Sequence, residues 1–303
     1  MRIDGVLRET LRMPPHVAPV VVSRIKVMAR LDIAERRVPQ DGRIGLTLGG
    51  KLLDVRVSTL PSRAGERGVL RILDKDDAGI LYAGLRLLND GSRNILTVED
   101  PVEYAIEGVG QTQVNDKVGL SFATGLRAIL RQDPDVVMVG EIRDRETADI
   151  AVQASLTGHL VLSTVHTNDA VGAITRLRDM KIEPFLLAST LRAVIAQRLV
   201  RRLCQNCREP VQASGSVSAL LGFDTGTVIY EARGCAECNN SGYKGRIGVF
   251  EAVRIDEAIR RLINANGDEA VIANHAFRNA PNLGSAARAL VREGVTTAEE
   301  AVR

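Results

Sequence analysis

The sequence predicts an α/β fold built around a parallel β-sheet, and three observations lead to it. Compact apolar segments at residues 95–98, 136–139 and 160–164 alternate with stretches that have the apolar spacing of helices. Each of these segments runs directly into polar or charged residues. The chain has 303 residues, 45% of them hydrophobic, which suffices for buried cores in two or three domains. Short apolar strands between helices are typical of a parallel sheet that is buried on both faces, with the carboxyl ends of its strands at one edge.

The region before this sheet is predicted to form a small α+β unit. Residues 3–13 are expected to be a strand, and residues 16–31 have helix-like apolar spacing. Residues 43–73 alternate apolar and polar positions. This pattern predicts strands joined by turns, and the first turn is marked by Gly49 and Gly50.

The same turn contains the nearest approach to a phosphate-binding loop. Such a loop reads G-x-x-x-x-G-K-[ST], and residues 45–51 read G-L-T-L-G-G-K. Leu52 then stands where a hydroxyl would bind magnesium, and a strand rather than a helix follows. We therefore interpret the segment as a β-hairpin.

Glu141 is the first candidate for catalysis. It follows the apolar strand 136–139 and Gly140, so a parallel sheet would deliver it to the edge where ligands bind. A carboxylate in this position suits a base, or a group that positions water for phosphoryl transfer. The alternative is structural, since many apolar strands end in an acid.

Polar groups also follow the other two strands. Glu99, Asp100 and Glu103 crowd beyond the strand at 95–98, and crowded acids need a cation such as magnesium or solvent to compensate them. His166 lies in a Ser-Thr-Val-His-Thr-Asn cluster after the third strand, which is suited to sensing a phosphate. His159, at the start of that strand, is expected to be structural.

The four cysteines indicate a metal site. Cys204 and Cys207 form one C-x-x-C pair, Cys235 and Cys238 form another, and 27 residues separate the pairs. Two such knuckles make a closed tetrahedral thiolate site for structural zinc, with no open position for catalysis. Four unrelated reduced thiols are the alternative reading.

Charge and hydropathy exclude little. The net charge of +3 gives no argument for nucleic acid or a membrane surface, and no nucleic-acid partner is expected. No apolar run approaches the roughly 20 residues that span a bilayer, and the N-terminus has no signal-peptide core. The expected location is cytoplasmic.

The three strand-end segments resemble those of the secretion ATPases of bacterial type II secretion and type IV pili. In that family they are the aspartate box, the Walker B strand in its Gly-Glu form, and the histidine box. The four-cysteine module brings the likeness nearest to the type II secretion ATPases. Further matching segments are 34–43, 107–115, 126–134 and 197–200.

The resemblance implies a fold and a domain order. A partial α+β domain at 1–75 would precede a RecA-like phosphate-loop nucleoside-triphosphatase core at 76–200. A four-cysteine zinc module at 201–245 and a C-terminal helical region at 246–303 would follow. It also implies a homo-hexamer that binds Mg-ATP between subunits and works with cytoplasmic and inner-membrane platform components, peripheral to the inner membrane.

The implied activity is ATP hydrolysis that powers pseudopilus assembly and protein export across the outer membrane. Glu141 would act on the attacking water and His166 would lie near the terminal phosphate. The residues matching the aspartate box and the basic phosphate contacts are Glu99, Asp100, Glu103, Arg127, Arg143 and Arg198.

One part of the family pattern is missing. Family members carry a strand and a G-P-T-G-S-G-K-[ST] loop before Leu-Tyr-Ala-Gly-Leu, whereas here residues 73–80 pass directly into Leu81. In this fold class the missing strand is central, and unpaired buried backbone groups cost about 1–3 kcal/mol each. Three hypotheses stay open: a secretion ATPase with impaired turnover, a zinc-stabilised pseudo-ATPase or interaction module, and a nonfunctional truncated derivative.

Overall fold

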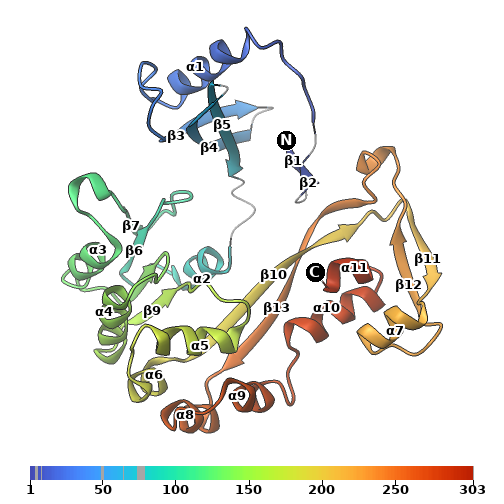
Figure 1. Ribbon diagram of the computed structural model, residues 1–303. Coiled ribbons are helices and arrows are strands. Elements are labelled where there is room, and N and C mark those ends of the chain that lie inside the picture. The colour runs from blue at the N-terminus through green and yellow to red at the C-terminus, as the bar shows by residue number, and fades with distance from the viewer. Residues whose placement is uncertain (4–5, 8, 49–50, 64, 74–78, 303) are drawn as a thin grey trace.

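The computed structural model describes the chain except residues 4–5, 8, 49–50, 64, 74–78 and 303 (Figure 1). Three parts follow one another along the chain. A small α+β unit comes first, a central α/β unit comes second, and a long two-stranded ribbon leads from the centre to a cysteine-bearing module and to the C-terminal helices.

The N-terminal unit packs one helix on a three-stranded antiparallel sheet of order β3-β4-β5. Its core consists of Ala29, Ile44, Val55 and Val57, with Ile25 of the helix packed against them. Leu48 pairs directly with Lys51, which confirms the hairpin, while Gly49 and Gly50 themselves lie outside the described residues. The elements are α1 (Ala18–Met28), β3 (Gln40–Leu48), β4 (Lys51–Ser62) and β5 (Gly65–Leu73).

The strand predicted over residues 3–13 is wrong. Of the described residues in this stretch, only those of β1 (Arg2–Ile3) and β2 (Val6–Leu7) are extended and paired, and residues 9–14 are irregular. Leu11 is 75% exposed, so its apolar side chain does not contribute to a core. Pro14 and Pro15 follow directly, and proline offers no N–H to a ladder. The apolar residues of this stretch therefore did not indicate a strand, because residues 9–14 have no partner strand in the described structure.

A buried ion pair joins α1 to β5. Lys26 is fully buried, forms an ion pair with Glu66, and donates to the backbone oxygen of Glu35 at 2.7 Å. Removing one member of such a pair leaves an uncompensated buried charge, which typically costs about 3–5 kcal/mol. We expect Glu66→Ala to accelerate amide exchange throughout α1, measured by hydrogen-exchange mass spectrometry. Glu9→Ala, which removes an exposed ion pair, is the control and should change little.

The double variant Lys26→Met with Glu66→Leu separates charge from packing. Replacing a buried ion pair by apolar groups of similar volume is often close to neutral. The double variant should therefore exchange much more slowly than Glu66→Ala. Equal exchange in Glu66→Ala and the unaltered chain would refute the importance of this pair.

The central unit contains a four-stranded sheet of order β7-β6-β8-β9 in which all pairs are parallel. The three predicted strands are confirmed as β6 (Ile95–Glu99), β8 (Val136–Val139) and β9 (Leu160–Ser163). β7 (Val109–Gln113) was not predicted, because its sequence V-G-Q-T-Q has no apolar run. The surrounding helices are α2 (Ile80–Leu88), η1 (Asp116–Val118), α3 (Phe122–Ile129), α4 (Arg145–Leu156), α5 (Ala170–Asp179) and α6 (Pro184–Thr190).

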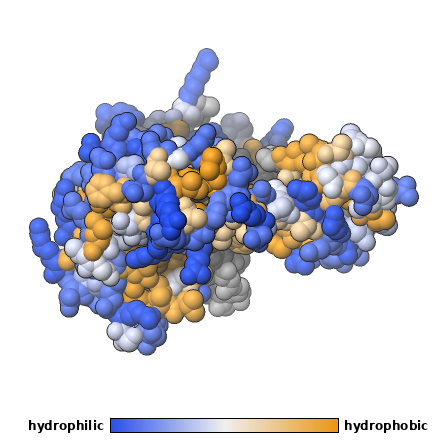
Figure 2. Space-filling model, turned by 90° about the horizontal axis from the view of Figure 1, so that it is seen from below, coloured by the Kyte–Doolittle hydropathy of each residue, from blue (hydrophilic) through white to orange (hydrophobic). Residues whose placement is uncertain are grey.

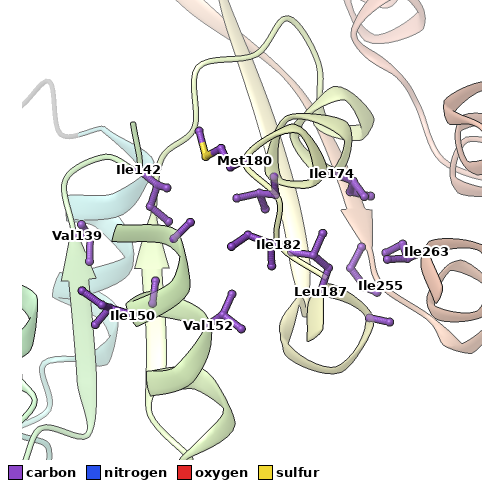
Figure 3. Close-up of a cluster of buried hydrophobic side chains, with 14 of the residues drawn as sticks. Val139, Ile142, Ile150, Val152, Ile174, Met180, Ile182, Leu187, Ile255 and Ile263 are labelled. Carbon is purple, nitrogen blue, oxygen red and sulfur yellow. The ribbon is translucent and has the colours of Figure 1, made fainter. Parts of the chain in front are cut away.

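Helices cover both faces of the inner strands. Val136 and Met138 face α2, where they pack with Tyr82 and Leu85. Their neighbours on the strand, including Val139, belong to a larger cluster with α3 and α4 that continues through α5 and α6 to α8 (Figure 3). The prediction of a sheet buried on both faces is confirmed for β6 and β8. β9 differs because it lies at the edge of the sheet.

The C-terminal part is organised by a ribbon in which β10 (Ala193–Leu203) pairs antiparallel with β13 (Tyr243–Arg254). The cysteine-bearing module extends from the far end of this ribbon (Figure 1). Helices α10 and α11 pack against the ribbon, whereas α8 and α9 pack against α6 and α5 of the central unit. The C-terminal helices begin after β13, later than the predicted residue 246. The remaining elements are β11 (Arg208–Gln212), α7 (Gly215–Leu221), β12 (Val228–Ala232), η2 (Ala236–Cys238), α8 (Glu257–Asn264), α9 (Glu269–Ala276), α10 (Leu283–Arg292) and α11 (Ala298–Val302).

The apolar groups on the described surface do not form a membrane-spanning helix. Figure 2 shows separate apolar patches on a largely hydrophilic face. Among the described helices, none has the length and apolar character needed to cross a membrane.

Candidate functional site

Three side chains meet at the carboxyl edge of the sheet. Glu141 follows β8, and His166 follows β9 with its Nε2 atom 3.1 Å from Glu141 Oε2. Arg143 donates to the other carboxylate oxygen of Glu141. Glu141 is only 13% exposed, whereas the side chains of His166 and Arg143 are 86% and 58% exposed. The site is therefore a shielded carboxylate between two solvent-facing nitrogen groups.

Hydrogen bonds beyond the ladder fix the loops that carry these groups. Thr164 Oγ1 donates to the backbone oxygen of Gly140 at 2.8 Å, and the Ile142 amide donates to the Thr164 oxygen at 2.9 Å. The Gly140 amide in turn donates to Val98 of β6 at 2.8 Å. The three strand ends are thus tied together, which holds the positions of Glu141 and His166.

The charges at this site reinforce one another. The hydrogen bond from Arg143 is the main cause that lowers the pKa of Glu141; burial opposes it, and the hydrogen bond with His166 adds to it. The same contact raises the pKa of Arg143. Glu141 is therefore ionised near neutral pH and can accept a proton or orient a water molecule.

The Arg143 contact can be tested by titration. Arg143→Ala should raise the pKa of Glu141 toward its ordinary value of 4.5, as followed by carboxyl ¹³C NMR. A carboxyl with a lowered native pKa contributes stability above pH 4.5 that is lost as the pH falls through the native pKa. The variant should therefore lose less stability between pH 7 and pH 3 than the unaltered chain. Arg145→Ala, which removes an exposed pair with Asp149, should leave the titration unchanged, and an unchanged midpoint in Arg143→Ala would refute the assignment.

Glu99 lies in a different environment from Glu141. It is 3% exposed and accepts hydrogen bonds from Tyr82, from Thr97 at 2.5 Å and from Gln111 at 3.1 Å. Burial, followed by the contact with Glu99, raises the pKa of Tyr82. The carboxylate of Glu99 thus belongs to an internal network beneath α2, with its oxygens already engaged.

The other predicted site residues are distributed around this edge. Asp100 is exposed and acts electrostatically on Arg143, and the backbone amide of Glu103 donates to Tyr82. Arg127 on α3 pairs with Glu146 at 2.7 Å, away from Glu141. Arg198 on β10 donates to the backbone and side-chain oxygens of Asn168, both at 3.1 Å. The structure therefore brings together Glu141, Arg143 and His166 and leaves Arg127 outside the group.

The four cysteines converge at the far end of the ribbon. Their sulfur atoms all lie within 4.8 Å of one another, and no other metal-competent group of acids, histidines or cysteines occurs in the described part of the chain. Three of the sulfur–sulfur distances are 3.9, 3.8 and 3.8 Å. A tetrahedron with zinc–sulfur bonds of about 2.3 Å has edges of about 3.8 Å. The donor set therefore fits a four-coordinate zinc ion.

Backbone geometry around these sulfurs supports the same reading. The amides of Gly234 and Gly242 donate to Cys207 and Cys238 at 3.3 and 3.2 Å. Gly242 has φ +75°, and a Cβ there would lie 2.5 Å from the Ala232 side chain, so a larger residue cannot replace it without strain. Although burial acts against it, amide donors lower the pKa of Cys238 to about 6. Such amide–sulfur bonds are the outer-shell support that a thiolate site requires.

Several contributing residues were not identified from the sequence. Tyr82 and Gln111 bind Glu99 from distant segments, and nothing in their local sequence indicates this. Glu251 on β13 could have been found. It alternates with Val249 and Val253 on the buried face of β13, so an acid stands in an apolar register.

Comparison with known proteins gives a consistent result. The family model of type II/IV secretion system proteins matches residues 1–80 and 77–303. The type II secretion system protein E of Pseudomonas aeruginosa is 54% identical over 343 aligned positions, covering 100% of this chain and 68% of that protein. The type II secretion system ATPase E of Vibrio cholerae is 50% identical over 345 positions, with the same coverage.

Solved structures support the fold alone. The pilus retraction motor PilT with bound ADP matches with a TM-score of 0.65 at 24% identity, covering 99% of this chain and 88% of that one. The Legionella pneumophila ATPase DotB matches with a TM-score of 0.65 at 18% identity, covering 97% and 84%.

The comparisons also show that these relatives have positions without a counterpart in this chain. The alignment with the Pseudomonas protein has 343 positions and includes all 303 residues, so at least 40 positions have no counterpart here. The family model is matched in two pieces that meet at residues 77–80. This is the junction between β5 and α2.

Proposed function

Because the chain belongs to the family of type II/IV secretion system proteins, we propose that its central unit is the nucleotide-hydrolysing core of a type II secretion ATPase. The observation that carries the proposal is the meeting of Glu141, Arg143 and His166 at the carboxyl edge of the parallel sheet. In parallel α/β sheets, ligands bind beyond this edge. The family membership supplies the substrate class, ATP.

Each of the three groups has a chemical role in this proposal. Glu141, held ionised by Arg143, orients the attacking water and accepts its proton. His166 is 86% exposed and can reach a terminal phosphate beyond the sheet. Arg143 supplies positive charge where negative charge develops on the phosphate. Arg198 acts indirectly, because its hydrogen bonds hold Asn168, which lies beside His166 in the same loop.

Magnesium would accompany ATP, where it neutralises phosphate charge. The three acids near the end of β6 do not form a ready-made metal site in the described chain. Glu99 is engaged by three internal donors, which leaves Asp100 as the exposed carboxylate at this edge. We assign Asp100 to the cation and Glu99, with Glu103, to supporting that loop.

We propose that the unmatched positions lie at the β5–α2 junction, where the family match divides, and that they hold the phosphate-binding loop and its strand. β9 offers the place for that strand, because it is an edge strand and Leu160 is 41% exposed. Without the loop, the backbone and lysine donors for the phosphates are missing, so ATP turnover by this chain is impaired. Restoring the segment and measuring Mg-ATP affinity tests the proposal.

The wider role follows from the same family. We assign the complete protein to a cytoplasmic homo-hexamer at the inner membrane that contacts platform components and powers pseudopilus assembly and export across the outer membrane. What supports this is the identity of 45–54% to proteins named for type II secretion.

A second function rests on a different observation. The zinc-fitting cysteine module and the ribbon that carries it lie far along the chain from the β5–α2 junction. A pseudo-ATPase or interaction module could use them without ATP turnover. It would bind a complete relative in size-exclusion chromatography, whereas a nonfunctional truncated derivative would neither bind that relative nor hydrolyse ATP.

A further inference from the structure

One buried acid outside the candidate site joins two helices. Glu251 lies on β13 and is 3% exposed. Its Oε1 atom accepts from the Ala170 amide at 2.6 Å, and its Oε2 atom accepts from the Leu283 amide at 2.8 Å. These are the first residues of α5 and α10. A single carboxylate therefore closes the N-terminal ends of two helices that are far apart in sequence.

Neither helix requires this carboxylate as an ordinary cap. Asp169 already caps α5 by accepting from the Gly172 amide, and Asn282 caps α10 by accepting from the Ser285 amide. Among the described residues, Glu251 has no ion pair with a basic side chain, so its charge is compensated by amides and by the positive ends of two helix dipoles. The arrangement is a bridge between two helices that each have a cap of their own.

The first end of this bridge lies beside the candidate site. Ala170 is four residues after His166, and the intervening Asn168 is held by Arg198. Glu251 pairs across the ribbon with Ala196, so Arg198, two residues further along β10, lies on the same face. The two strands of the ribbon thus hold the His166 segment at two points.

The second end reaches the cysteine-bearing module. On α10, Ala287 packs with Val200 and Val249 of the ribbon. Val291 on the same helix packs with Ile229 of β12, inside the module. A displacement of the module therefore moves α10, and the start of α10 is bonded to Glu251.

We propose that Glu251 is a positioning residue that couples α10 and the cysteine-bearing module to the loop that carries His166. The coupling is mechanical and runs through one carboxylate whose two oxygens serve different helices. Its relevance to catalysis rests on the proposed function. Hydrogen exchange tests the coupling without nucleotide, so a negative result would leave the nucleotide proposal untouched.

The test perturbs one end and observes the other. Asn282→Ala removes the cap of α10 only. By hydrogen-exchange mass spectrometry of the full chain, it should accelerate exchange at residues 280–290 and also, through Glu251, at residues 164–175. In a Glu251→Gln background the amide nitrogen cannot accept, so the second effect should disappear. Glu251→Gln alone should accelerate exchange at the start of α5 or α10 about fivefold or more, because a buried donor is left unpaired.

Glu231→Gln is the matched control, since it makes the same charge change at an exposed position on β12. It should alter neither segment. If Asn282→Ala accelerates amide exchange at residues 280–290 and leaves exchange at residues 164–175 unchanged, the two hydrogen bonds of Glu251 act independently and the proposal fails. This outcome needs no Glu251 variant, so the test stands even if Glu251→Gln does not fold.

Discussion

Insertion of the proposed phosphate-loop segment between Lys75 and Leu81 is expected to raise the affinity of this chain for Mg-ATP at least about a thousandfold. A phosphate-binding loop donates several charge-assisted hydrogen bonds, each contributing about 1.5–3 kcal/mol. Three of them would account for a factor of about a thousand or more. The inserted residues would be those that the Pseudomonas protein carries at the unmatched positions, and titration calorimetry would measure the affinity.

Two controls make the result specific. A scrambled insert of the same length should not raise the affinity. Glu141→Gln in the restored chain should retain binding and lose turnover by about 100- to 10,000-fold, the usual contribution of a general base. Micromolar Mg-ATP affinity in the chain without an insert would contradict the proposed role of the segment. Full turnover in restored Glu141→Gln would contradict the role of Glu141.

Substitution of Cys238 by serine is expected to remove zinc and unfold the module at the end of the ribbon. Protein purified without chelator should contain about one zinc ion per chain, as four thiolates require. Structural zinc in small domains contributes about 10–16 kcal/mol of apparent binding energy, which is coupled to folding. Little besides the metal stabilises the fold of the module, because its buried apolar cluster is small and centres on Ala213, Leu221, Phe223 and Ile229.

Metal analysis and hydrogen exchange over residues 204–242 would measure this effect. Gln205→Ser, an exposed neighbour within the first C-x-x-C pair, is the control and should keep its zinc. A zinc content near zero in the unaltered protein would refute the site. Loss of zinc without faster exchange would show that the metal binds but does not hold the module together.

Where the sequence predicted structure well, local pattern and tertiary environment agreed. The apolar runs of β6 and β8 become inner strands because helices cover both of their faces. The alternation at residues 9–14 failed because the described structure gives it no partner strand. β7 is the opposite case, since its polar sequence forms a strand by pairing with β6 over five residues. In both cases the partner strand decided the outcome.

The residues of the candidate site also differ in how well the sequence predicted their positions. Glu141 and His166 could be placed together from sequence, because the ends of neighbouring parallel strands share an edge. Glu99 and Asp100 could not be separated in this way. Glu99 points into a network with Tyr82 and Gln111, whereas Asp100 faces solvent. The difference depends on partners of Glu99 that lie 12 and 17 residues away in the sequence.

The place where the cysteine-bearing module joins the ribbon bears on how the length of such a chain can vary. Leu203 pairs with Tyr243, and the Cys204 amide donates to the Gly242 oxygen at 2.9 Å, so the chain leaves and re-enters the ribbon at adjacent points. Everything between them is topologically an insertion in the tip of a hairpin. Such an insertion can vary in length without altering the register of β10 and β13.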